Sequence, residues 1–205
     1  PTRQMWLNLL GDDRHVDPNK NNFKYSNYDL DLTTHPIDTK RMKDLINLIS
    51  DKANVEQKLP EHQGWGISFL RSFGSFVAAA TKVEVVNNKV TVLEMHTAVD
   101  CGIVVTPDRV KAQMEGAMIF GLSIALMGEI SVVEGKVQQS NFHDSPVTRM
   151  NQVPEMYVHL VESDAPPGGI GEPGVPPVAP SITNAIYHAS KTRIRDLPVN
   201  KIFTV

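Results

Sequence analysis

The chain has 205 residues, enough to bury a full hydrophobic core. Apolar residues make up 41% and charged residues 21%, which is ordinary for a globular protein, and the net charge of -3 gives no electrostatic case for nucleic-acid binding. The single cysteine, Cys101, excludes an internal disulfide, a thiolate zinc site and an iron–sulfur cluster held by this chain alone. No apolar run is long enough to span a bilayer.

The first part of the chain predicts two helices separated by an irregular segment. Residues 2–10 carry apolar side chains at helical spacing. Residues 12–36 are rich in Asp, Asn, Lys and Tyr and show no periodicity, which predicts a polar, irregular excursion. Asp38 is a typical N-cap for the second helix, which we expect to end near Asn54.

The next part predicts a hairpin. Residues 64–73 and 75–86 have the composition of strands, and Val alternates with charged residues near the end of the second. Asn87-Asn88 predicts a type I′ turn, after which residues 90–96 return antiparallel.

A long helix is predicted from an N-cap at Thr106, with Pro107 at the first helical position, to about Met127. Gly116 and Gly121 lie inside it, where a glycine costs ~1 kcal/mol against alanine. We therefore expect close packing there against another backbone or a ligand.

The remaining segments complete an α+β fold of antiparallel hairpins packed with a few helices. Residues 129–137 predict a second hairpin and residues 155–162 a further strand. We expect residues 1–62 to form a helical N-terminal segment with the irregular polar insertion, and residues 63–205 to form an α+β domain.

A loop rich in glycine and proline precedes the last predicted helix. Gly168–Pro177 holds four glycines and three prolines, which predicts a tightly shaped loop with Glu172 as its one ionisable side chain. A carboxylate in a rigid loop near a helix N-terminus is a common setting for a catalytic acid or base, although a solvated loop glutamate is the alternative. Gln113 suits hydrogen bonding to a polar ligand, or forms a surface pair with Glu115.

Other possible sites have weaker support. Apolar neighbours predict a buried, inert Cys101, and Asp100 is expected to bond the backbone of the following turn. The histidines lack metal-binding spacing, and the chain has neither a phosphate-binding loop nor a dinucleotide fingerprint. The absence of a nucleophile elbow argues against a cofactor-free hydrolase.

Several motifs occur in a specific order from about Gly64 to the end of the chain. They are Val99-Asp100-Cys101-Gly102, Thr106-Pro107-Asp108, Ala112-Gln113-Met114-Glu115-Gly116, Phe120-Gly121-Leu122, Gln139-Ser140-Asn141-Phe142-His143-Asp144, Val161-Glu162-Ser163 and the run from Gly168 to Pro180. This ordered set closely resembles the molybdopterin-binding large subunit of the xanthine oxidase family. Within that family it is most similar to the beta subunits of isoquinoline 1-oxidoreductase and related bacterial aldehyde dehydrogenases.

The resemblance implies a molybdenum-dependent oxidoreductase that hydroxylates N-heteroaromatic rings or oxidises aldehydes, with water as the oxygen source. Glu172 matches the family's catalytic glutamate, which acts as a general base. Gln113 matches a glutamine that hydrogen-bonds the pterin, and Gly171 is expected to flank the metal. No residue of this chain is assigned as a direct metal ligand. Electrons would leave through iron–sulfur clusters on a small partner subunit.

The family's large subunit is several times longer than this chain and contributes further cofactor-binding segments upstream. We therefore expect this chain to be the C-terminal portion, which would need the N-terminal part of the subunit and would bind no molybdopterin and turn over no substrate alone. The alternative is a non-catalytic structural or interaction module of a larger complex. No feature of the sequence favours either the cytoplasm or the periplasm.

Overall fold

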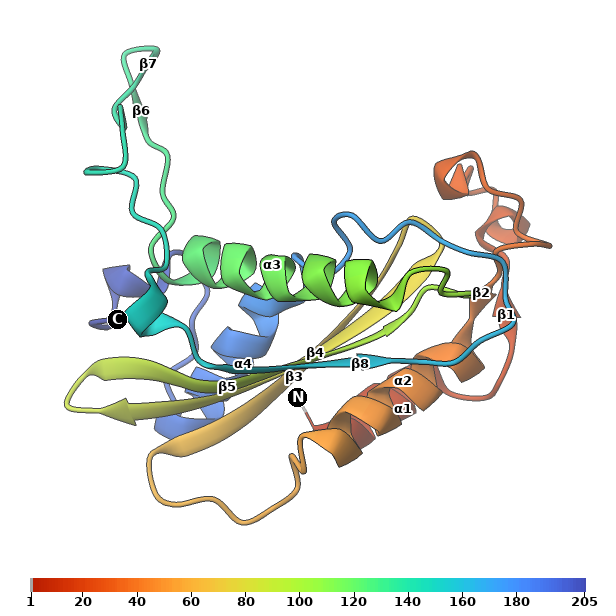
Figure 1. The fold of residues 1–205 in the computed structure, drawn as a ribbon, viewed down its shortest axis with the longest axis horizontal. Coiled ribbons are helices and arrows are strands. Elements are labelled where there is room, and N and C mark those ends of the chain that lie inside the picture. The colour runs from red at the N-terminus through yellow and green to blue at the C-terminus, as the bar shows by residue number, and fades with distance from the viewer. Residues whose placement is uncertain (1) are drawn as a thin grey trace.

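A four-stranded sheet lies at the centre of the computed structural model, which describes residues 2–205 (Figure 1). Its strands β3 (Gln63–Ser72), β4 (Ser75–Val86) and β5 (Lys89–Asp100) form an antiparallel meander, and β8 (Glu155–Leu160) pairs with β5 in parallel. The predicted α+β class with antiparallel hairpins is confirmed. The parallel strand is a feature that the sequence patterns did not predict.

Two tight turns shape the meander. Asn87 and Asn88, between β4 and β5, have φ values of 50° and 61°, which confirms the predicted type I′ turn. Phe73 and Gly74, between β3 and β4, also have positive φ values, of 52° and 76°. A phenylalanine rarely adopts this left-handed conformation, so the surroundings of Phe73 must hold it there.

Helices α1 (Arg3–Leu10) and α2 (Thr39–Lys52) cover one face of the sheet. The Asp38 carboxylate accepts hydrogen bonds from the backbone N–H groups of Lys40 and Arg41, which confirms the predicted N-cap. The cluster buried beneath α2 combines residues of the helix and of the sheet: Met42, Leu45, Ile49, Ala53, Trp65, Ile67, Phe76, Ala78, Ala80 and Ala98. The division of the chain at residue 62 stays a prediction.

Helices α3 (Pro107–Leu126) and α4 (Val178–Ser190) cover the other face. Helix α4 approaches β3 closely, because a Cβ atom at Gly64 would lie only 2.6 Å from the backbone of Ala185 and Ala189. The bounds of α3 agree with the prediction, with Pro107 at its first turn. Within residues 2–205, however, the Thr106 hydroxyl makes no capping hydrogen bond.

The two glycines of α3 have different surroundings. An added Cβ at Gly121 would lie 2.6 Å from Cβ of Val178, so the predicted close packing is confirmed there. At Gly116 an added Cβ would meet no atom of the described residues within 4 Å. Close packing against the backbone of residues 2–205 is therefore wrong for Gly116, and the alternative of a ligand there stays a prediction.

This contrast gives a matched pair of stability predictions. Gly121→Ala gains helix propensity but forces α3 away from Val178, and we expect a net loss of about 1–3 kcal/mol in the free energy of unfolding. Gly116→Ala gains the propensity without a clash and should stabilise the chain by up to ~1 kcal/mol. Urea denaturation of both variants checks the difference, and equal effects would contradict the packing described here.

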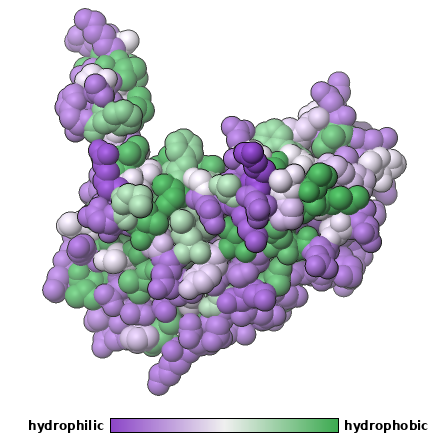
Figure 2. All heavy atoms as spheres, viewed as in Figure 1, coloured by the Kyte–Doolittle hydropathy of each residue, from purple (hydrophilic) through white to green (hydrophobic). Residues whose placement is uncertain are grey.

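A hairpin arm formed by residues 128–147 projects from the end of α3 (Figure 1, upper left). It contains β6 (Val132–Val133) and β7 (Lys136–Val137), as the sequence predicted. Its apolar side chains are exposed, and Figure 2 shows apolar surface on the arm.

The irregular excursion lies at the opposite end of the molecule (Figure 1). It contains the two-residue strand β1 (His15–Val16), which pairs with β2 (Ile37–Asp38), and two short 3-10 turns. Among residues 2–205, none of the helices combines the length and the apolar character needed to cross a membrane.

Candidate functional site

The topology of the sheet brings the predicted site residues to one place. Because β5 and β8 are parallel, their carboxyl ends meet at the same edge. The segment after β5 leads into α3 with Gln113, and the segment after β8 leads into the loop with Glu172. Ligand sites of sheets with parallel strands commonly lie outside such carboxyl ends.

The first half of the Gly168–Pro177 loop is fixed by the ends of the sheet. The backbone N–H of Gly169 donates to the carbonyl of Phe73 at 2.7 Å, and the Ser75 hydroxyl donates to the carbonyl of Gly169 at 2.7 Å. The N–H of Gly168 donates to the carbonyl of Cys101 at 2.9 Å. A Cβ atom at Gly169 would lie 2.7 Å from Cβ of Phe73, so this contact requires a glycine.

The second half of the loop lies on α3. The N–H of Val175 donates to the carbonyl of Glu172 at 2.9 Å, which closes a turn around the predicted catalytic residue. A Cβ atom at Gly174 would lie 2.7 Å from Cβ of Ala117, so the loop backbone rests directly on the helix. The Gln113 amide Nε2 donates to the carbonyl of Gly171 at 3.2 Å, which joins two predicted site residues directly.

Glu172, Gln113 and Gly171 all line one cavity of about 430 Å³. Its walls come from the β3–β4 turn, the outer face of α3 and the loop itself, and its lining residues are Ser72, Phe73, Gln113, Gly116, Ala117, Phe120, Gly171, Glu172, Pro173, Val175 and Pro176. Both Gln113 and Glu172 are exposed, so their polar groups are accessible to a ligand. The structure thus brings the three predicted residues together at a largely apolar cavity.

Phe73, Ser72 and Phe120 were missed by the sequence analysis. The sequence pattern places Phe73 at the end of a strand, yet the residue occupies the turn and lines the cavity. The available signal was a bulky aromatic residue directly before Gly74, at a position where the turn requires a left-handed conformation.

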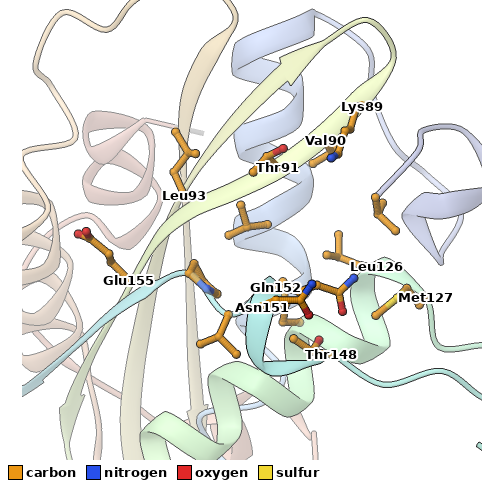
Figure 3. A pocket seen from close by; sticks show the side chains of 15 residues that line it. Lys89, Val90, Thr91, Leu93, Leu126, Met127, Thr148, Asn151, Gln152 and Glu155 are labelled. Atoms are coloured by element: carbon orange, nitrogen blue, oxygen red, sulfur yellow. The ribbon is translucent and has the colours of Figure 1, made fainter.

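A larger cavity of about 540 Å³ lies at the other end of α3 (Figure 3). It is lined by the start of β5, the last turn of α3 and the segment before β8, including Leu126, Asn151, Gln152 and Glu155. Because its lining residues come from the other end of the helix, it is distinct from the Glu172 cavity.

The residues around Glu172 fit a polar ligand such as a pterin. Gln113 uses one amide hydrogen to hold Gly171, which leaves its second amide hydrogen and its carbonyl oxygen for a bound group. Gly116 lines the same cavity and has open space beside its backbone. A larger residue at this position would place its side chain in the space that a ligand could fill. The cavity therefore has the free hydrogen-bonding groups and the open space that a polar ligand would need.

A buried ion pair lies at the end of β5, directly before Cys101, whose carbonyl contacts the loop. Asp100 is 4% exposed and accepts two hydrogen bonds from Arg41, from Nε at 2.7 Å and from Nη2 at 2.6 Å. Its Oδ1 also accepts from the N–H of Gly102 at 3.2 Å, which confirms the predicted bond to the following turn. The neighbouring Cys101 is buried as predicted, and burial raises the pKa of its thiol. A thiol that keeps its proton is a poor nucleophile.

A second polar cluster lies on the face that α2 covers. His96 is 4% exposed, and its Nδ1 lies 3.0 Å from Nε2 of His159 while its Nε2 lies 2.7 Å from the Glu94 carboxylate. Burial, followed by the charges of His96 and Lys52, lowers the pKa of His159 from 6.5 to about 4.

This shift predicts how stability depends on pH. Between pH 6.5 and about 4 the unfolded chain binds a proton at His159 that the folded chain does not bind. The contribution of neutral His159 is therefore complete above pH 6.5 and is lost as the pH falls towards 4. For a half-buried group we expect a loss on the order of 1–2 kcal/mol. Urea denaturation at pH 7 and pH 4.5 should show this loss, and His159→Gln should reduce it.

Residues 23–154 match the family model of the molybdopterin cofactor-binding domain. The chain belongs to this family. The matched range includes Gln113 and Phe73, while Gly171 and Glu172 follow it in the sequence.

Two relatives of this molybdopterin cofactor-binding domain are oxidoreductases. The isoquinoline 1-oxidoreductase beta subunit of Brevundimonas diminuta is 46% identical over 112 residues, which are 55% of this chain and 14% of that protein. The membrane-bound aldehyde dehydrogenase (pyrroloquinoline-quinone) of Gluconacetobacter polyoxogenes is 40% identical over 110 residues, 54% of this chain and 14% of that protein. The aligned part of the chain thus spans about a seventh of the length of these relatives.

Solved structures show the same fold. Quinoline 2-oxidoreductase from Pseudomonas putida 86 superposes with a TM-score of 0.56 at 19% identity, over 61% of this chain and 17% of that one. The aldehyde oxidoreductase of Desulfovibrio desulfuricans superposes with a TM-score of 0.54 at 25% identity, over 63% and 15%. The resemblance to molybdenum oxidoreductases of the xanthine oxidase family is confirmed by these relatives.

Proposed function

We propose that this domain supplies the general base of a molybdenum hydroxylase that hydroxylates N-heteroaromatic rings or oxidises aldehydes with water. The observation that carries the proposal is the shared cavity of Glu172, Gln113 and Gly171, in a chain that belongs to the molybdopterin cofactor-binding family. A carboxylate that is accessible at such a cavity can accept a proton, and the direct bond between Gln113 and Gly171 links its loop to α3.

In this proposal each residue has a distinct role. The bound cofactor would take up the two electrons released when substrate and water combine. Glu172 would accept the proton that water loses as its oxygen adds to the electron-poor carbon of the substrate. Gln113 would hold the loop through Gly171 and offer its remaining amide groups to the pterin.

The substrate class has support from the cavity and from the relatives. Phe73, Phe120 and Val175 give the cavity apolar walls that suit a flat ring or a short aldehyde. One relative is named for isoquinoline, one for aldehyde, and a solved structure with the same fold for quinoline.

The partners in this proposal are the rest of the large subunit and a small iron–sulfur subunit. The matched relatives are about four times longer than this 205-residue chain, since the 112 and 110 aligned residues make up only 14% of each. The wall described here therefore holds the base and one hydrogen-bonding glutamine, while the other walls of the cofactor site come from the rest of the subunit.

The same reasoning predicts that the 205-residue chain, produced alone, retains no molybdenum and has no turnover. Elemental analysis of the purified chain measures the metal directly. Stoichiometric molybdenum together with activity on isoquinoline or an aldehyde would contradict this prediction.

Glu172→Gln in the complete enzyme tests the proposed function, because the amide keeps the shape of the side chain but cannot accept the proton. Loss of turnover with molybdenum retained supports the base. One observation favours the alternative of a non-catalytic interaction module, namely the exposed apolar side chains of the 128–147 arm. Unchanged turnover in Glu172→Gln would favour that alternative.

A further inference from the structure

The irregular excursion packs against the turn that holds the candidate catalytic loop. The Tyr28 ring lies 4.5 Å from the Phe73 ring, centre to centre, with 32° between their planes. The Tyr28 hydroxyl lies 3.0 Å from the Ser72 hydroxyl, so the two are hydrogen-bonded. A single side chain of the excursion therefore contacts two residues that line the Glu172 cavity.

The backbone that presents Tyr28 has an unusual conformation. Asn27, Tyr28 and Asp29 have φ values of 50°, 58° and 60°, a left-handed run that residues other than glycine rarely adopt. Buried Asn27 holds this run, because its Nδ2 donates to the carbonyl of Leu30 at 2.8 Å and to that of His35 at 3.2 Å. Such a conformation persists only where the surroundings fix it, and it is frequent at functional sites.

The contacts of Tyr28 continue to the loop of Glu172. Phe73 is itself left-handed, and its carbonyl accepts the N–H of Gly169 at 2.7 Å. If the turn relaxed, this carbonyl would move and Gly169 would lose its bond. Glu172 follows Gly169 by three residues in a loop with no regular secondary structure, so its position depends on where the loop is anchored.

A second contact joins the excursion to the same loop region. Nε2 of His35 lies 3.3 Å from the carbonyl of Pro167, directly before the loop. Arg71, at the end of β3, fixes the excursion in turn, since its Nη2 donates to the carbonyl of His35 at 2.8 Å. The segment that carries Tyr28 is therefore held both by the end of β3 and by the residue before the Glu172 loop.

We propose that Tyr28 is a positioning residue, which holds the Phe73 turn and thereby sets the place of Glu172 in the cavity. Contact between the two tilted rings keeps Phe73 in its left-handed conformation. The hydrogen bond between the Tyr28 and Ser72 hydroxyls fixes the residue before the turn. The catalytic consequence rests on the proposed function, whereas the anchoring of the loop does not.

The test uses the complete enzyme with its partner subunits and the variants Tyr28→Ala and Tyr28→Phe. Tyr25→Phe is the matched control. It also removes a tyrosine hydroxyl from the excursion, but that hydroxyl accepts a hydrogen bond from Arg71 and does not contact the Phe73 turn. Hydrogen exchange of the peptide containing Gly169 reports the anchoring of the loop. The values of kcat, KM and molybdenum content report catalysis and cofactor binding.

In Tyr28→Ala we expect at least ~10-fold faster exchange of the Gly169 amide and a kcat lower by about 10–100-fold, with molybdenum and KM little changed. Tyr28→Phe keeps the contact between the rings and loses only the hydroxyl, so it should lose about 3-fold in kcat. The Tyr25→Phe control should match the parent enzyme in both measurements.

An unchanged rate of hydrogen exchange at Gly169 in Tyr28→Ala would overturn the proposal, whatever the activity of the variant. The proposal would also be overturned if Tyr25→Phe changed the exchange rate and kcat as much as Tyr28→Ala does. Faster exchange with unchanged kcat would overturn the positioning role if Glu172→Gln is inactive. If Glu172→Gln is fully active, the proposed function fails, and hydrogen exchange alone still decides whether Tyr28 anchors the loop. If Tyr28→Ala loses molybdenum or fails to fold, the same two measurements on Tyr28→Phe decide.

Discussion

Replacement of Glu172 by glutamine in the complete enzyme is expected to lower kcat by about 10²–10⁴-fold, the range that a general base contributes. The turn around this residue uses its backbone carbonyl, which accepts the N–H of Val175, so the substitution leaves the loop intact. Molybdenum content and KM should therefore stay close to those of the parent enzyme. Steady-state kinetics with isoquinoline or an aldehyde, together with metal analysis, check the prediction.

Glu115→Gln is the matched control for this experiment. Glu115 is an exposed glutamate on α3, two residues from Gln113, and the same chemical change there lies outside the set of residues that line the cavity. Its activity should match that of the parent enzyme. Equal losses in the Glu115 and Glu172 variants would indicate a general effect of charge on the domain and would contradict a specific base.

Arg41→Leu is expected to lower the free energy of unfolding by about 3–5 kcal/mol, because it leaves the buried Asp100 carboxylate without its partner. The Asp100 side chain is 6% exposed and that of Arg41 18%, so water replaces the lost hydrogen bonds poorly. Urea denaturation of the 205-residue chain measures the loss. Lys40→Leu, which breaks an exposed pair with Asp44, should cause no measurable change.

A double variant separates loss of the pair from loss of its partner. Arg41→Leu combined with Asp100→Leu removes both charges, and we expect it to recover part of the stability lost in Arg41→Leu alone. Recovery should be incomplete, since Asp100 also accepts the N–H of Gly102 next to the loop. A double variant that is less stable than Arg41→Leu would contradict an unpaired buried charge as the cause.

Features set by local rules could be predicted from the sequence. The cap at Asp38, the Asn87-Asn88 turn and the bounds of α3 depend on a few neighbouring residues, and the structure confirms them. The composition of the loop around Glu172 likewise indicated a shaped loop before a helix, which is the arrangement that the structure shows.

Features that depend on packing between distant segments could not be predicted. The register that pairs Glu94 of β5 with Glu155 of β8 in parallel is set by how α3 packs back on the sheet. Two glycines of α3 looked alike in sequence, yet Gly121 contacts Val178 and Gly116 faces the cavity. The role of Phe73 depends on the conformation of its turn and on its contact with Tyr28, which lies 45 residues earlier in the chain. Neither can be read from the sequence around Phe73.

The parallel pairing of β5 with β8 has a consequence for the order of folding. The β3–β4–β5 meander closes through two-residue turns and can form quickly. Strand β8 is separated from β5 in the chain by α3 and the projecting arm, so their pairing closes a much longer loop. Each closure over a long segment costs chain entropy before its contacts form. We therefore expect the scaffold to be complete in an early kinetic phase and the surroundings of Glu172 to be assembled in a later, slower one.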